Sequence, residues 1–111
     1  MKSITAFFIF SVLSIGCKDF YSQESDCIQS TVLKFETTRL CEHGASVKAY
    51  QFSGSTVYVF DEGACGADMQ SAVLDANCHV LGYLGGIVGN SEINGVEFST
   101  NASYLRTVWG N

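Results

Sequence analysis

The sequence predicts an α+β domain in which one N-terminal helix packs on a small antiparallel sheet of hairpins, with disulfides as staples. Three observations predict this fold class. Apolar residues near position 30 recur with a helical period, the runs that follow alternate with a period of two, and cysteines occur in both parts. Because the 111 residues contain no proline and no internal linker, we expect a single domain over residues 25–111.

The first sixteen residues have the pattern of a secretory signal peptide. Lys2 supplies a positive charge, and the uncharged run Ile4 to Gly16 follows it. As a helix this run would span about 20 Å, less than the ~30 Å hydrocarbon core of a bilayer. We therefore expect residues 1–16 to be removed on export, which leaves residues 17–24 as a short tether.

Five cysteines are an odd number for an exported protein, and Cys17 accounts for the odd one. The residues Leu13 to Cys17 resemble the lipobox of bacterial lipoproteins, although Ser14 stands where leucine is usual. This resemblance implies acylation of Cys17 and a lipid anchor in the outer membrane or at the cell surface. The alternative is ordinary cleavage near Tyr21 to Gln23, which would release a soluble secreted protein.

The other four cysteines are predicted to form two disulfides, because the number is even and the compartment oxidising. Four cysteines allow three pairings. We expect the local pairs, Cys27 with Cys41 and Cys65 with Cys78, because each would join the ends of one supersecondary unit. A zinc site is the alternative, but the sequence lacks closely spaced cysteine pairs and paired histidine ligands.

The helix is predicted over residues 26–37. Asp26 is a suitable N-cap, and Gln29 stands three residues later, as in a capping box. Ile28, Val32 and Phe35 form one apolar stripe.

A hairpin is predicted next, with strands over residues 47–52 and 55–60 and a turn at Ser53-Gly54. Small aliphatic side chains suit the face that packs on the helix. These are Val47, Ala49, Val57 and Val59, and the aromatic face of Tyr58 and Phe60 is the alternative.

The second half of the chain carries three further sheet signals. A hairpin is predicted over residues 71–81, with its turn at 75–77. Asn94-Gly95 predicts a type I′ turn. Residues 104–109 read as a closing strand.

The same half resembles a family of small, uncharacterised bacterial lipoproteins. The resemblance covers roughly residues 45–100 and is carried by four segments: Val57-Tyr58-Val59-Phe60, Cys65-Gly66-Ala67-Asp68, Val73 to Cys78, and Gly85-Gly86-Ile87-Val88-Gly89. Relatives often carry Gly-Asp after the glycine segment, where this chain has Gly89-Asn90. The resemblance implies an anchored or secreted domain, and it implies no activity.

Charge and motifs exclude several function classes. A net charge of −5 without a basic run argues against nucleic acid as a partner. Catalysis by a Cys-His pair would use His43 or His79, but their neighbouring cysteines are better employed in disulfides. Residues 90–95 follow the spacing of a calcium loop with too few acidic ligands, and the glycines of 82–89 lack the lysine of a P-loop.

We therefore expect no catalytic residues, no metal and no cofactor. The expected role is that of a non-enzymatic cell-envelope lipoprotein that binds a protein or a glycan. Aromatic side chains are the candidate binding surface, namely Tyr58, Tyr83 and Trp109. The alternatives are a diffusible secreted binding or inhibitor protein and a small hydrolase.

Overall fold

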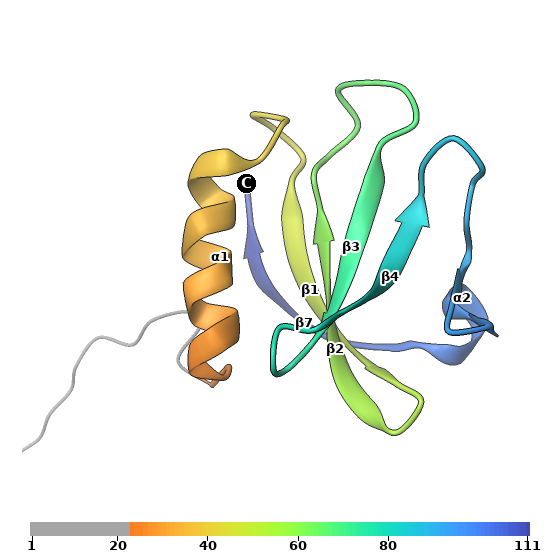
Figure 1. Ribbon diagram of the computed structural model, residues 1–111. Coiled ribbons are helices and arrows are strands. Elements are labelled where there is room, and N and C mark those ends of the chain that lie inside the picture. Colours follow the sequence, from red (N-terminus) through yellow and green to blue (C-terminus); the bar gives the residue numbers. More distant parts are fainter. Residues whose placement is uncertain (1–22) are drawn as a thin grey trace, which may run out of the picture.

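The computed structural model describes residues 23–111 as one long helix beside a curled antiparallel sheet (Figure 1). The elements follow one another in the order α1 (Asp26–Thr38), β1 (Ser46–Phe52), β2 (Ser55–Asp61), β3 (Gln70–Asp75), β4 (Val80–Gly85), β5 (Glu92–Ile93), β6 (Val96–Glu97), α2 (Phe98–Asn101) and β7 (Ser103–Gly110). This arrangement confirms the predicted α+β class. The first two predicted hairpins and the predicted closing strand join into one five-stranded sheet, which is larger than expected.

Helix α1 begins at Asp26, within the predicted bounds, but Asp26 is not its N-cap. Its N-cap is Ser25, whose hydroxyl accepts the Ile28 N–H at 3.2 Å and donates to the Ala76 carbonyl at 2.7 Å. Ser25 therefore caps the helix and also ties it to the β3–β4 turn, so that Asp26 is the first helical residue. The predicted stripe of Ile28, Val32 and Phe35 is buried.

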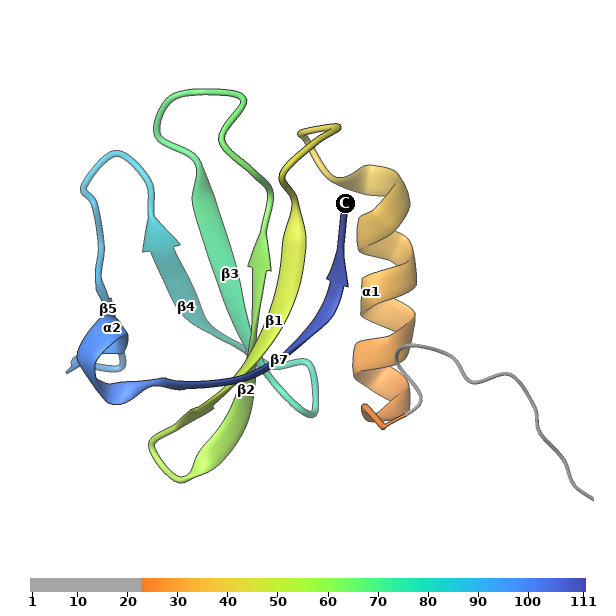
Figure 2. The ribbon, with the colours of Figure 1, turned by 180° about the vertical axis from the view of Figure 1, so that it is seen from behind.

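The sheet has the strand order β4-β3-β2-β1-β7, and all neighbouring strands are antiparallel. Hairpins join β1, β2, β3 and β4 in succession, and β7 then returns to pair with β1 at the other side (Figure 2). Between β4 and β7 the chain forms the separate β5–β6 hairpin. Asn94 and Gly95 have φ values of 54° and 80° in its turn, as the predicted type I′ geometry requires.

The face that packs on α1 is partly aromatic, which corrects the prediction. Val47 lies opposite Phe60 and Ala49 lies opposite Tyr58, so the aromatic residues of β2 share the face of the small residues of β1. The tight turn between β1 and β2 sets this register, and side chains alternate from it along each strand. Val57 and Val59 therefore lie on the other face, where they pack with the second core cluster. The helix-side core comprises Ile28, Val32, Phe35, Ala45, Val47, Ala49, Tyr58, Phe60, Leu74 and Val108.

The opposite face of the sheet is covered in part by β5, β6 and α2. Ile93 of β5 and Phe98 of α2 are buried against it. Gly82 of β4 permits this contact, because a Cβ atom there would lie 3.0 Å from the Ile93 side chain. The second core cluster comprises Phe52, Val57, Val73, Ile93 and Phe98.

All four predicted cysteines form disulfides, but the predicted pairing is wrong. The pairs are Cys27–Cys78 and Cys41–Cys65, with Cα–Cα distances of 6.1 and 5.7 Å. Cys27 lies in the first turn of the 13-residue helix α1 and Cys41 lies beyond its last residue, so the length of the helix, about 20 Å, separates them. Strand β3 separates Cys65 from Cys78 by a similar length, about 20 Å. A disulfide spans no more than about 7 Å between Cα atoms, so neither local pair can form.

The observed disulfides join elements that are distant in sequence. Cys27–Cys78 links the first turn of α1 to the β3–β4 turn. Cys41–Cys65 links the loop after α1 to the β2–β3 loop.

The predicted signal peptide, the lipidation residue Cys17 and most of the tether lie outside the described residues. Within residues 23–111, no helix has the length and apolar character needed to cross a membrane.

An apolar groove between helix and sheet

A groove of about 370 Å³ runs between α1 and the β3–β4 side of the sheet. The sheet splays away from the helix on this side (Figure 1). Most of the lining residues are apolar, and they come from α1, β2, β3, β4 and the two loops that the Cys41–Cys65 disulfide joins. They are Thr31, Phe35, Leu40, Phe60, Glu62, Met69, Gln70, Ala72, Leu74 and Tyr83.

The floor of the groove follows from the register of three strands. Phe60 of β2 lies opposite Ala72 of β3, and Ala72 lies opposite Tyr83 of β4. The three side chains therefore form one row across the helix-side face. Because the alanine side chain is small, it leaves a hollow between the rings of Phe60 and Tyr83.

One end of the groove is polar. The Leu40 N–H donates to the Glu62 carboxylate at 2.7 Å, and this bond fixes the loop that follows α1. Leu40 itself is 72% exposed at the mouth of the groove. Glu62 is the only carboxylate among the lining residues, and no lysine, arginine or histidine lines the groove. The site therefore offers an apolar hollow with a hydrogen-bond acceptor of negative charge at one end.

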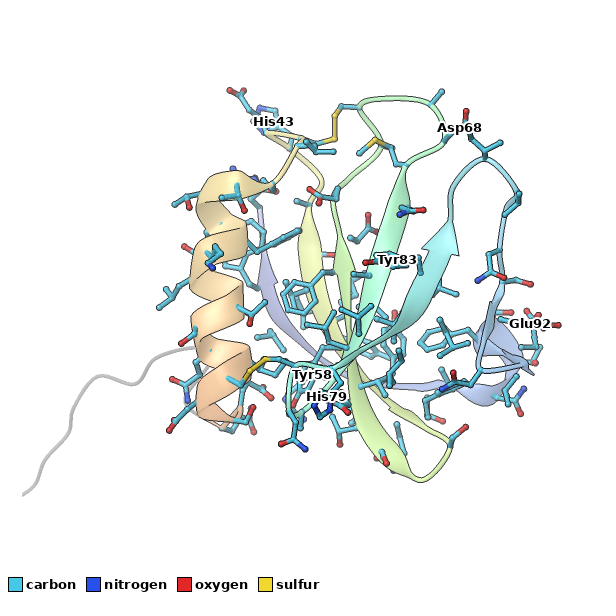
Figure 3. The ribbon with its side chains drawn as sticks, in the orientation of Figure 1. His43, Tyr58, Asp68, His79, Tyr83 and Glu92 are labelled. Carbon is cyan, nitrogen blue, oxygen red and sulfur yellow. A yellow bond between two sulfur atoms is a disulfide. The ribbon has the colours of Figure 1, made fainter. Side chains whose placement is uncertain are left out.

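Of the predicted surface residues, only Tyr83 belongs to this site. It is 46% exposed and forms one wall (Figure 3). Trp109 is half-buried, with its ring edge-on to Phe35 and the Arg39 guanidinium 5.2 Å above it. A binding role for Trp109 would need an exposed ring face, and the Arg39 guanidinium covers one of the two faces of its ring.

The prediction for Tyr58 is wrong, because this residue is only 3% exposed. Its hydroxyl donates to the Glu24 carboxylate at 2.7 Å beneath the helix. Burial and the negative charge of Glu24 raise the pKa of Tyr58 to about 12. Burial alone would raise the pKa of Glu24, but hydrogen bonds from Arg106 and Tyr58 hold it below its ordinary value. None of Tyr58, Glu24 and Arg106 lines the groove. Their hydrogen bonds join the segment before α1 to strands β2 and β7.

The two histidines do not adjoin a free thiol in the described residues. His43 lines a shallow hollow with Cys65, whose sulfur is held in the disulfide with Cys41. His79 is exposed in the β3–β4 turn, with Nδ1 3.2 Å from the Asp75 carboxylate. Backbone N–H groups of the same turn lower the pKa of Asp75. These contacts stabilise a turn, and they place no nucleophile beside a base.

The two remaining motifs have structural explanations. The Asn90 side-chain amide donates to the carbonyls of Tyr83 and Glu92, at 2.6 and 2.8 Å. Asn90 thus holds β4 to the start of β5, and residues 23–111 contain no cluster of three potential metal ligands. In the glycine segment, the N–H groups of Gly85, Gly86 and Gly89 all donate to backbone carbonyls. Those donors are therefore engaged within the protein.

Four exposed or groove-lining residues were not among the predicted surface residues: Leu40, Met69, Ile87 and Val88. These apolar side chains stand in loops, and Ile87 and Val88 are 85% and 86% exposed. The sequence does contain a signal for Ile87 and Val88: they stand between turn residues, where polar side chains are usual.

Comparison with known proteins places residues 33–111 in one family. This part of the chain matches the model of a domain of unknown function, DUF6970. Since the match covers most of the chain, the protein belongs to this family. No curated protein and no solved structure matches the chain.

Proposed function

We propose that this member of the DUF6970 family is a non-enzymatic binding module of the bacterial cell envelope. Its groove would receive an apolar side chain of a protein partner. The observation that carries the proposal is the preformed apolar hollow of about 370 Å³, with Tyr83 and Leu40 exposed at its mouth. Its size falls in the range of ligand sites, about 300–1,000 Å³.

The chemistry of the lining supports binding over catalysis. General acid–base catalysis uses titratable groups that converge on one point. The groove offers a single carboxylate, Glu62, and this group already accepts the Leu40 N–H. Transfer of a partner's apolar side chain from water into this hollow would be favourable, and Glu62 and Gln70 would orient the partner's backbone beside it.

A lipid anchor on Cys17 would set the direction in which the groove faces relative to the membrane. The described chain starts at the N-terminal end of α1, whereas Leu40 and Glu62 lie beyond its C-terminal end (Figure 1). An anchored protein would therefore present the mouth of the groove away from the membrane. The two disulfides suit the oxidising compartment that this proposal requires. A diffusible secreted binding or inhibitor protein is the alternative, and the mass of the mature chain distinguishes the two.

The groove is tested by site-specific photo-crosslinking in the native host. A benzophenone amino acid replaces Tyr83, and the control places it at Ser55, an exposed residue at the start of β2. We expect one discrete protein adduct from position 83 and none from position 55. Ala72→Leu, which fills the floor, should abolish the adduct, whereas Thr100→Leu on exposed α2 should not. The proposal would be contradicted if position 83 gave no adduct, or if its adduct formed equally well in Ala72→Leu. An adduct that a glycosidase removes would indicate a glycan partner.

The anchor is tested by intact mass of the protein from its native host. A chain that begins at Cys17 and carries a lipid-sized increment supports the lipoprotein. A bare chain that begins near Glu24 supports the diffusible alternative.

A further inference from the structure

Ile87 and Val88 are the most exposed of the large apolar side chains in the described residues, at 85% and 86%. They occupy the centre of a tight turn that the Gly89 N–H closes by donating to the Gly86 carbonyl at 3.1 Å. Turn centres favour glycine, proline and short polar residues, and β-branched aliphatic residues belong in strands. The folded domain gains little packing from this pair.

The turn is nevertheless held firmly. Gly85 and Asn90 exchange two backbone hydrogen bonds, of 2.8 and 3.0 Å, at its base. The Gly86 N–H donates to the Met69 carbonyl at 3.0 Å, and Met69 lines the groove. These bonds hold the backbone of the turn against the wall of the groove, so that a partner would lose little backbone entropy there.

The charges at this end of the molecule are negative. Asp68 precedes Met69, whose carbonyl accepts the Gly86 N–H of the turn, and Figure 3 places Asp68 next to the β4–β5 loop. Glu62 supplies a second carboxylate at the polar end of the groove. Arg39 is engaged with the protein, because its guanidinium donates to the carbonyls of Glu36, Cys41 and Glu42 and lies over Trp109. The chain as a whole carries a net charge of −5.

Building on the proposed groove function, we propose that Ile87 and Val88 form a second contact with the same partner. The partner chemistry that fits is a protein segment with aliphatic side chains flanked by lysine or arginine. Aliphatic side chains match the groove and the turn, and basic side chains match the carboxylates around them. An anionic lipid surface has the wrong charge for this end of the molecule.

Defined peptides test this chemistry on the mature protein. The probe is a soluble peptide in which leucine and lysine alternate. One matched peptide carries glutamate in place of lysine, and the other carries serine in place of leucine. We expect the leucine–lysine peptide to bind at least about tenfold more tightly than either, and to shift the methyl signals of Ile87 and Val88.

Two variants separate the turn from the groove. Ile87→Ser with Val88→Ser should weaken the leucine–lysine peptide about tenfold, and Leu33→Ser with Val80→Ser, two other exposed aliphatic residues, should not. If the turn variant binds normally while Ala72→Leu abolishes binding, the turn contact is overturned and the groove stands. If neither matters, or if all three peptides bind equally, both proposals are overturned. Sedimentation with phosphatidylethanolamine–phosphatidylglycerol vesicles that depends on Ile87 and Val88 would overturn the protein partner in favour of a lipid surface.

Discussion

Glu24 and Arg106 form a bidentate ion pair that ties the residue before the helix cap to strand β7. Arg106 Nε donates to one carboxylate oxygen at 2.8 Å, and its terminal nitrogen donates to the other at 2.7 Å. The Glu24 side chain is 1% exposed and the Arg106 side chain 31%. Tyr58 donates a third hydrogen bond to the same carboxylate, so the segment before α1 is part of the fold.

Removal of the Glu24 carboxylate should destabilise the protein substantially. Glu24→Ala leaves Arg106 and Tyr58 without their acceptor, and we expect a loss of about 2 to 4 kcal/mol, discounted because Arg106 is partly solvated. Urea denaturation measures the loss. Glu42→Ala, an exposed glutamate on the next loop, is the control and should change stability by less than about 0.5 kcal/mol. Equal effects of the two variants would contradict the stabilising role of the pair.

Tyr58 should make the folded protein less stable in alkali. Its pKa is about 12 in the fold against an ordinary 10.0, so at a pH between these values the unfolded chain loses a proton that the folded chain keeps. The free energy of unfolding should therefore be unaffected below pH 10 and fall as the pH rises toward 12. Unfolding at a series of pH values measures the slope, and Tyr58→Phe, which keeps the ring, should make it shallower. An unchanged slope in this variant would rule out Tyr58 as the source.

The disulfide pairing makes a direct chemical prediction. Proteolysis without reductant should release peptides that join Cys27 to Cys78 and Cys41 to Cys65. The sequence separations of 51 and 24 residues correspond to about 4 and about 3.5 kcal/mol in the chain-entropy model. Replacement of both members of either pair by serine should therefore cost several kcal/mol in denaturation. Mass spectra that show Cys27 joined to Cys41 would refute this fold.

Gly63 should be required for the Cys41–Cys65 staple. A Cβ atom at Gly63 would lie 2.9 Å from Cys41 Cβ and 3.1 Å from the His43 carbonyl oxygen, and its φ is +107°. We expect Gly63→Ala to cost about 2 to 4 kcal/mol from clash and strain. Gly44→Ala is a matched control, because Gly44 also has a positive φ, +85°, but an added Cβ would meet nothing within 4 Å. The control should show the conformational cost alone, about 1 kcal/mol, and similar losses in thermal denaturation would contradict the clash.

Local signals predicted the elements well, because periodicity, caps and turns act between neighbours in sequence. The stripe of α1 and the Asn94-Gly95 turn are examples. Cysteine pairing failed because it depends on which elements meet in space. The helix-side face failed for a related reason: the register of β1 and β2 joins Ala49 to Tyr58, and preferences for small side chains do not set that register.

The candidate site was predictable only in part. Tyr83 was selected as an aromatic residue and lies in the groove. The hollow itself results from Ala72 standing between two rings on neighbouring strands, and this relation exists only once β2, β3 and β4 are in register. Tyr58 lies on the same face of the sheet as Tyr83, but it stands on the inner strand β2, where α1 covers it, whereas Tyr83 stands on the edge strand β4.

Asn90 should be required as an amide rather than an acid. Its side-chain nitrogen donates to the carbonyls of Tyr83 and Glu92, and its oxygen accepts the Glu92 N–H at 3.4 Å. In Asn90→Asp both donated bonds are lost, and a carboxylate faces two carbonyl oxygens. We therefore expect a loss of about 2 to 3 kcal/mol and faster hydrogen exchange in β4 and β5.

The control for this change is Asn94→Asp. It adds the same charge four residues away, and Asp-Gly suits a type I′ turn as Asn-Gly does, so stability should change by less than about 0.5 kcal/mol. Because Asn90 also fixes the base of the turn that carries Ile87 and Val88, Asn90→Asp should broaden their methyl signals while Asn94→Asp leaves them sharp. If the two variants behave alike, the amide of Asn90 does not order this end of the sheet.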